Sequence, residues 1–326
     1  MTSTLVEVRS WGYDAHRDRR GPSQRHGRTD GPELTRPDQG RPYGRGARPG
    51  VPLLWVADLV LGDGTPALEP ALTLAAAAAV TERVRLGFGV LSLPPRPAPW
   101  VASQVATLQH LSRGRIELGV GIGGFPDSPW WRALDVSPRG RGRATDSTLD
   151  LSPSLVTGAE TSVGEEGTRL RLAPAASMPP VWIGGGEAAF ARVLRHGGGW
   201  FPSQLSPPDL AGAISRPSAA ADERGLPAPP VTVGGHLILG TDDRAERARA
   251  LLVRELIEHH GISPEEAERA PMVARTPEEP AGLYTAYAEA GARRVVAGAD
   301  TMGWEEQLDF VAEALSHMDR APSSAG

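Results

Sequence analysis

The 326-residue sequence contains no cysteine, no lysine and no long apolar run. Without cysteine, a disulfide framework, thiolate catalysis, cysteine-ligated zinc and iron–sulfur clusters are all excluded. The longest apolar run, residues 71–80 with one threonine inside, is half of a bilayer span, and no apolar stretch at the amino terminus resembles a signal peptide. We therefore predict a cytoplasmic chain that uses neither a membrane nor a metal site.

Positive charge is carried by arginine alone and is concentrated at the start of the chain. Residues 1–50 hold ten arginines against six acidic residues, whereas the remaining chain has a net charge of −9. Aromatic residues make up only 5% of the sequence, and none are interleaved with the basic ones as in a base-stacking platform. The composition therefore predicts no nucleic-acid partner.

The first fifty residues differ in composition from the rest of the chain. Between residues 14 and 50 the only large apolar side chains are Leu34 and Tyr43. Such a segment cannot bury enough apolar surface to offset the entropy of ordering, so we predict disorder over 1–50, apart from a short strand at 4–8. A folded domain is expected over 51–318, followed by a tail at 319–326.

From residue 51 onward, strand and helix patterns alternate. Strands are predicted at 53–57, 84–91, 116–120, 181–183, 200–201, 231–239 and 294–297. Helices are predicted at 71–80, 100–111, 143–156, 187–194, 207–224, 242–260 (capped by Thr241), 278–290 and 304–318. In the second of these, Val101, Val105, Leu108 and Leu111 recur at helical spacing.

This alternation predicts a parallel sheet joined by crossover helices. With the segment 4–8, the strands number eight, which is the count that closes a (β/α)8 TIM barrel. A doubly wound open sheet is the alternative, but no G-x-G-x-x-G pattern opens a helix after the first strand.

Glycine is enriched where three of the predicted strands end, around 87–89, 121–124 and 184–186. Glycine lets backbone N–H groups approach a ligand closely, and in a barrel the site lies at these carboxyl ends. The turn Gly184-Gly185-Gly186, which leads into a helix, suits a phosphate best. A tight turn alone would explain any single loop, but three together predict a phosphorylated cofactor.

Longer motifs run through these loops. They are TERVRLG at 81–87, GVLSLP at 89–94, ATL at 106–108, LSRGR at 111–115, LGVG at 118–121, PPVWIGGG at 179–186, RHGGGWFP at 195–202, TPEE at 276–279 and YAEAGA at 287–292. In this order and spacing, from about residue 54 to 315, the sequence resembles the luciferase-like monooxygenase family. That resemblance implies a barrel of the bacterial-luciferase type that binds FMN or the deazaflavin coenzyme F420.

Residues at positions that match the family's motifs are expected to have the same roles in this chain. The resemblance implies that Asp58 and Ser92 lie near the ring and are catalytic, and that Gly89-Val90 forms a bulge that often holds a non-proline cis peptide. The cofactor-binding residues predicted in this way are Asp58, Gly89, Val90, Ser92, Gly121, Gly123, Gly184, Gly185 and Gly186.

Several positions depart from the family pattern. Leu59 replaces a histidine of many relatives, Pro97 replaces the histidine that often follows the arginine at Arg96, and Gly124 replaces a glutamate of F420-dependent relatives. Glu187 replaces a small hydroxyl residue and puts a negative charge beside the expected phosphate. The loss of the histidines and of the glutamate favours FMN and oxygen over F420.

The histidines and the amino terminus also differ from the family pattern. We interpret His196 as a helix cap and His236, in mid-strand, as a core residue, although it could point into the barrel. The amphipathic first helix of the family is missing, and a misassigned start or frameshift upstream of about Arg48 would explain this.

Together these features predict a monooxygenase that uses reduced FMN and O2 on a small organic substrate. The alternatives are F420-dependent hydride transfer and a catalytically silent flavin-binding barrel. The partners implied are the small-molecule substrate, a separate flavin or F420 reductase, and a second copy of the chain. Trp55, Phe88, Trp130 and Trp131 are candidates for an apolar substrate wall, unless they only form core.

Overall fold

The computed structural model describes residues 4–10 (backbone), 53–58, 68–124, 126–196, 198–258, 260–276, 278–299, 309–310 and 312–314. The strands are β1 (Thr4–Ser10), β2 (Leu53–Val56), β3 (Arg85–Ser92), β4 (Ile116–Gly121), β5 (Thr161–Val163), β6 (Thr168–Leu170), β7 (Val181–Gly184), β8 (Gly199–Phe201), β9 (Thr232–Leu239), β10 (Met272–Ala274) and β11 (Arg294–Ala299). The helices are α1 (Pro70–Val80), α2 (Ala98–Ser112), α3 (Trp130–Ala133), α4 (Arg141–Val156), η2 (Glu187–Ala189), α5 (Phe190–His196), α6 (Pro207–Asp222), α7 (Asp243–Glu258), α8 (Pro264–Arg269) and α9 (Glu279–Glu289).

Eight of the strands form a closed ring. The main sheet has the order β10-β9-β11-β1-β2-β3-β4-β7-β8. Its last strand returns to β9 through two parallel bridges, Trp200 to Val231 and Ser203 to Gly234, and the N–H of Gly234 donates to the Pro202 carbonyl at 2.8 Å. The predicted barrel is confirmed, and the open-sheet alternative is excluded. Strand β10 lies outside the ring, where it pairs with residues 237–239 at the carboxyl end of β9.

One strand runs against the predicted direction. β1 pairs antiparallel with both of its neighbours, with Val6 opposite Leu54 of β2 and opposite Ala297 of β11. The expectation of a wholly parallel sheet is therefore wrong at this strand. Strand composition specifies an extended segment, but direction depends on the connection, since only a long crossover returns a chain in parallel. The connection here, residues 11–52, lies outside the described residues.

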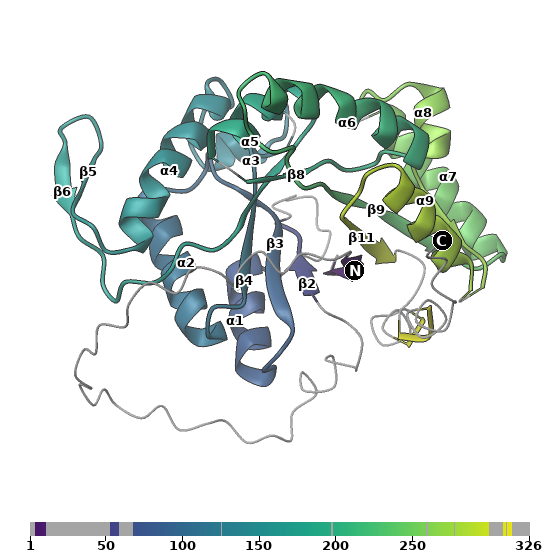
Figure 1. Ribbon diagram of the computed structural model, residues 1–326, viewed down its shortest axis with the longest axis horizontal. Helices are drawn as coiled ribbons and strands as arrows, with labels where there is room; N and C mark the ends of the chain where they lie inside the picture. Colours follow the sequence, from purple (N-terminus) through teal and green to yellow (C-terminus); the bar gives the residue numbers. More distant parts are fainter. Residues whose placement is uncertain are drawn as a thin grey trace.

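The helices cover the outer face of the ring, as Figure 1 shows for α1, α2 and α4 beside β3 and β4. On α2 the side chains of Val101, Val105 and Leu108 are buried, as predicted, but Leu111 is 44% exposed and Ser112 is buried instead. At 100° per residue, position 112 falls in the middle of the stripe and position 111 falls at its side. The hydroxyl of Ser112 accepts the N–H of Arg115 at 3.1 Å, which allows a polar residue there.

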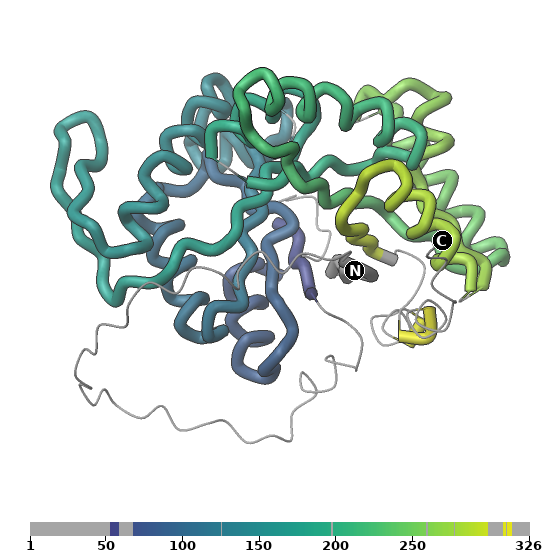
Figure 2. The backbone as a smooth tube through the Cα atoms, viewed as in Figure 1, coloured from purple at the N-terminus to yellow at the C-terminus, as the bar shows by residue number. Residues whose placement is uncertain are grey.

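Other element boundaries differ in detail. Helix α7 is capped by Asp242, whose carboxylate accepts the Ala245 N–H at 2.9 Å, and not by Thr241. The sequence patterns missed α3, α8, β10 and the β5–β6 hairpin, which projects from the body in Figure 2. The strand predicted at 4–8 is present as β1, whereas the predicted disorder over the rest of 1–50, the tail at 319–326 and most of the last helix lie outside the described residues.

Large side chains inside the ring are matched by glycines on adjacent strands. A Cβ on Gly87 would lie 2.3 Å from the Trp55 ring, and a Cβ on Gly199 would lie 2.2 Å from the Trp182 ring. Trp55 also meets Phe201 edge-on, with ring centroids 5.0 Å apart. These glycines are therefore required by packing of the barrel interior.

A buried ion cluster fills the amino-terminal end of the ring. Glu117, fully buried, accepts a hydrogen bond from Arg294 at 2.5 Å and forms an ion pair with Arg85 at 2.6 Å. The guanidinium of Arg294 also lies 4.5 Å from the centre of the Trp182 ring. This cluster of buried charges therefore lies at the end opposite to the expected site.

Candidate functional site

The candidate site is the rim, meaning the carboxyl ends of the ring strands. Asp58 follows β2 here. Its carboxylate accepts two hydrogen bonds from the guanidinium of Arg96, from Nη1 to Oδ2 (2.7 Å) and from Nη2 to Oδ1 (2.9 Å). Oδ2 also accepts the backbone N–H of Ser92 at 2.8 Å, and the Asp58 side chain is 1% exposed. With both oxygens engaged, Asp58 is suited to hold the loop after β3 in place.

Ser92 lies between this ion pair and two tryptophans. Its carbonyl accepts from Arg96 at 2.7 Å, so its backbone is fixed at both polar groups. A Cβ on Gly123 would lie 3.4 Å from the Ser92 Cβ and 3.3 Å from both Trp130 and Trp131, whose rings stack at 4.0 Å. Ser92 therefore faces an aromatic wall, in which Trp131 is buried and Trp130 is half-buried.

Val90 lies near the carboxyl end of β3, at the rim. The Gly89–Val90 peptide is cis, as the resemblance implied, and the pairing of β3 with β4 shifts register between Phe88 and Leu91. The Val90 side chain then lies over three glycines: an added Cβ would approach it to 3.1 Å from Gly119, 2.9 Å from Gly121 and 3.1 Å from Gly184. Val90, half-buried, forms a small apolar platform over these three glycines and also packs against the buried cluster that contains Trp55, Trp182 and Phe201.

The glycine turn after β7 lies beside this platform and is exposed. The carbonyl of Gly185, which has φ +119°, accepts from the indole N–H of Trp200 at 2.7 Å, and this bond holds the turn. An added Cβ on Gly186 would meet no atom within 4 Å, whereas Gly184 is enclosed by Val90 and Val120. Of the three glycines, Gly184 is needed by packing, Gly185 by backbone conformation, and Gly186 by neither.

Glu187, which directly follows the glycine turn, is paired with a cation. Its carboxylate pairs with the guanidinium of Arg216 on α6, and both side chains are about two-thirds exposed. The negative charge expected beside the turn is therefore compensated by a cation from the neighbouring helix.

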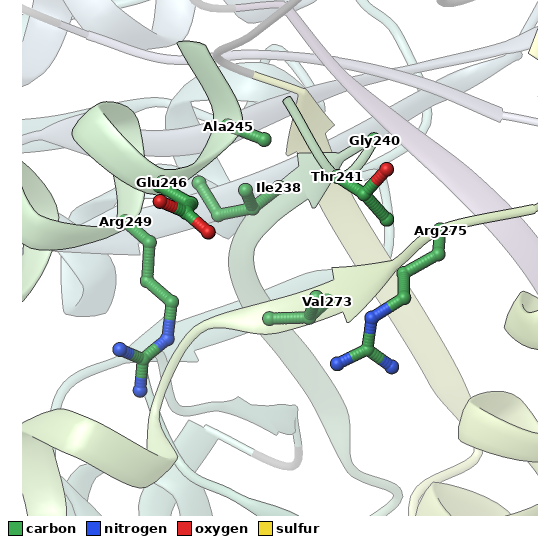
Figure 3. Close-up of a pocket in the computed structure, with 8 residues that line it drawn as sticks. All are labelled: Ile238, Gly240, Thr241, Ala245, Glu246, Arg249, Val273 and Arg275. Carbon is green, nitrogen blue, oxygen red and sulfur yellow. The ribbon is translucent and has the colours of Figure 1, made fainter. Parts of the chain in front are cut away.

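A separate cavity of about 400 Å³ lies where β9 and β10 end against α7. Figure 3 shows Arg249 and Arg275 on either side of Val273. Each guanidinium has a carboxylate neighbour, Glu268 at 2.5 Å and Glu279 at 3.9 Å. The sequence reasoning did not find this cavity, and both of its arginines already have carboxylate neighbours, so the rim remains the better candidate.

The two histidines singled out in the sequence lie in different places. His196 ends α5, with Nε2 3.9 Å from the Asp150 carboxylate, and burial lowers its pKa below the usual value. It is therefore placed at the amino-terminal side of the ring, away from the rim, as the helix-end interpretation expects. His236 lies on β9, and its side chain is half-buried.

The rim thus brings together the predicted residues on four strands. Asp58 and Ser92 meet across the ends of β2 and β3, while Gly121 and Gly184 lie under Val90 of β3. Sequence reasoning missed Arg96 and Arg216 as ion-pair partners. The arginine at 96 was visible within the family motif, but a partner 38 residues away leaves no local signal.

The part of the chain that the structure describes contains neither a membrane-spanning helix nor a metal-binding group of side chains. No helix there combines the length and apolarity needed to cross a bilayer. No group of three His, Asp or Glu side chains there could hold a metal ion.

Comparison with known proteins gives one family and several similar folds. The family described as luciferase-like monooxygenase matches residues 48–320. A curated relative, 4-hydroxyprotoasukamycin monooxygenase of Streptomyces nodosus subsp. asukaensis, is 34% identical over 177 residues, covering 52% of this chain and 46% of the relative. The chain spans about half the length of the curated relatives it matches.

Two solved structures share the fold across most of their length. An F420-dependent secondary alcohol dehydrogenase in complex with an F420–acetone adduct has a TM-score of 0.70 at 17% identity, covering 82% of this chain and 91% of that one. The oxygenating constituent of 3,6-diketocamphane monooxygenase from Pseudomonas putida, in complex with FMN, has a TM-score of 0.62 at 14% identity, covering 84% and 89%.

Proposed function

The chain belongs to the luciferase-like monooxygenase family, and we propose that it is an oxidoreductase using reduced FMN and O2 on a small organic substrate. One observation carries this proposal: Val90 forms an apolar platform over three glycines, directly beside an exposed glycine turn. A flat ring needs an apolar support with few competing side chains, and its phosphate needs backbone N–H groups at close range.

The residues present fit a phosphorylated flavin. Gly186 has open space where a side chain would stand, so a phosphate can approach the N–H groups of Gly185 and Gly186. Arg216 neutralises Glu187 and contributes positive charge to the same side of the rim. The resemblance assigns the same turn to the phosphate, so the local geometry and the family pattern support one site.

When bound, the cofactor would supply the redox chemistry, and the protein supplies position and environment. The Asp58–Arg96 pair holds the backbone of Ser92 through its N–H and its carbonyl, which fixes the position of this residue on the rim. Trp130 and Trp131 form an apolar wall that keeps water from one side. In this assignment Asp58 positions the loop, and Ser92 contacts the ligand.

F420-dependent hydride transfer is the second candidate, because the similar secondary alcohol dehydrogenase binds that coenzyme. Both cofactors carry a phosphate and would use the same turn. The 34% identity to a curated monooxygenase and the glycine at 124 support the FMN assignment.

Rapid mixing tests the function directly. Protein loaded with reduced FMN is mixed with oxygenated buffer, and flavin absorbance is followed; we expect reoxidation kinetics that differ at least fivefold from those of free reduced FMN. Gly186→Val, placed in open space, should return the kinetics to those of free flavin, whereas the matched control Gly282→Val on exposed α9 should behave as wild type.

Identical reoxidation with and without protein would contradict the oxygen reaction. If the protein instead reduces F420 with a secondary alcohol as donor, the second candidate replaces the first. An effect of Gly282→Val equal to that of Gly186→Val would show that the turn is not the binding site.

A further inference from the structure

We infer that His236 is the acid–base group of the rim, facing the bound cofactor or substrate; this inference rests on the proposed function. The sequence pattern alone favoured a core histidine at this position. The structure supplies three observations that together point to a different role: the direction of the side chain, its height in the barrel, and the chemistry of its neighbours.

The side chain of His236 points into the ring. On β9, an added Cβ on Gly234 would lie 3.0 Å from Phe201 inside the ring, whereas an added Cβ on Gly235 would meet Met272 outside it at 2.7 Å. Side chains alternate along a strand, so residue 236 shares the inner face with Gly234.

His236 also lies toward the rim. It is opposite Gly298, the fifth of six residues in β11, and it is half-buried, whereas Thr232, four residues earlier on the same face, is fully buried. Solvent therefore reaches the imidazole from the carboxyl end of the ring, which is the end where Val90 and the glycine turn lie.

Among the described inward positions near the rim, His236 is the titratable one. The others are Val90 on β3, Gly121 on β4, Gly184 on β7, Phe201 on β8 and Gly298 on β11. Asp58, the other acidic or basic candidate, has both carboxylate oxygens engaged.

The charged residues of the described elements packed against β9 lie at the far end of the ring or on its outer side. The flanking strands β8 and β10 carry no charged residue. On β11, Arg294 is at the far end of the ring and pairs with Glu117, as does Arg85 of β3. The acidic and basic residues of α7 are on the outer side of β9.

The chemistry is a reversible proton exchange. In the imidazolium form, one ring N–H bond breaks as an O–H or N–H bond forms on the ligand, and neutral imidazole remains; the reverse step returns the proton.

Nuclear magnetic resonance of protein labelled with 13C at histidine Cε1 tests this inference. The His236 signal is identified by its loss in His236→Gln, or in His236→Asn if the first variant does not fold. On saturation with oxidised FMN, or with F420 if FMN does not bind, we expect the titration midpoint of His236 to move by at least half a pH unit. The signal of His110, on outer helix α2, should not move.

Cofactor affinity gives a second readout. Between pH 5.5 and 8 the wild-type dissociation constant should change by threefold or more, and in His236→Gln it should be constant; His110→Gln should keep the wild-type dependence. Saturation that leaves the His236 signal unmoved, with equal pH dependence in both proteins, overturns the role of His236 alone. If neither cofactor saturates the wild type, the proposed function fails and this role fails with it.

Discussion

Replacing Arg96 with methionine will destabilise the fold, because it leaves a buried carboxylate without its cation. The Asp58 side chain is 1% exposed and that of Arg96 is 16% exposed, so water cannot readily replace the lost hydrogen bonds. After the change, Asp58 retains the Ser92 N–H as its partner. Removing one partner of a buried ion pair costs about 3–5 kcal/mol, and we expect Arg96→Met to fall in that range.

A double-mutant cycle measures the interaction itself. Arg96→Met, Asp58→Leu and the double variant are compared by equilibrium urea unfolding, and we expect the double variant to be more stable than the sum of the single effects by about 2 kcal/mol. Arg169→Met serves as the surface control: this arginine is 75% exposed, pairs with Glu160, and its loss should cost less than about 1 kcal/mol.

Additive effects within about 0.5 kcal/mol would refute the anchoring role of the pair. So would an Asp58→Leu protein that keeps full stability and cofactor affinity but loses turnover, since that result would make Asp58 a catalytic acid or base.

Three further predictions follow from individual contacts. Arg115 donates hydrogen bonds to carbonyls at the end of α1 and to Thr81, so Arg115→Met should lower the free energy of unfolding by about 2–4 kcal/mol, and a loss below 1 kcal/mol in urea would contradict this. Burial lowers the pKa of His196, so the unfolded state takes up the proton first; stability should fall as pH drops below about 6.5 and level off once the folded state is protonated, and His196→Gln should weaken this dependence in urea titrations at pH 7.5 and 5.5. Glu187→Ser should leave Arg216 unpaired beside the turn and tighten FMN binding severalfold by fluorescence quenching; unchanged affinity would place the phosphate elsewhere.

The architecture was predictable because strand and helix patterns alternate through most of the chain. The carboxyl ends of the strands, and hence the rim, follow from that alternation. The direction of β1 was not predictable, since an extended segment can pair in either direction and the choice depends on its connection.

The site was predictable only as residue types in a motif. The Asp58–Arg96 pair joins two loops that are separated by a helix and a strand, and no local pattern connects them. The direction of the His236 side chain could not be predicted for a different reason. Apart from Thr232 and His236, strand β9 is apolar and has glycines at both 234 and 235, so no clear alternation marks which face is inside.

Titration of the protein with FMN, riboflavin and F420, followed by fluorescence quenching, tests the central claim most directly. The account predicts one site per chain for FMN or F420, and an affinity for riboflavin that is more than tenfold weaker than for FMN, because two or three charge-assisted hydrogen bonds to the phosphate contribute about 1.5–3 kcal/mol each. Equal affinity for FMN and riboflavin, or saturation by none of the three compounds, would contradict it.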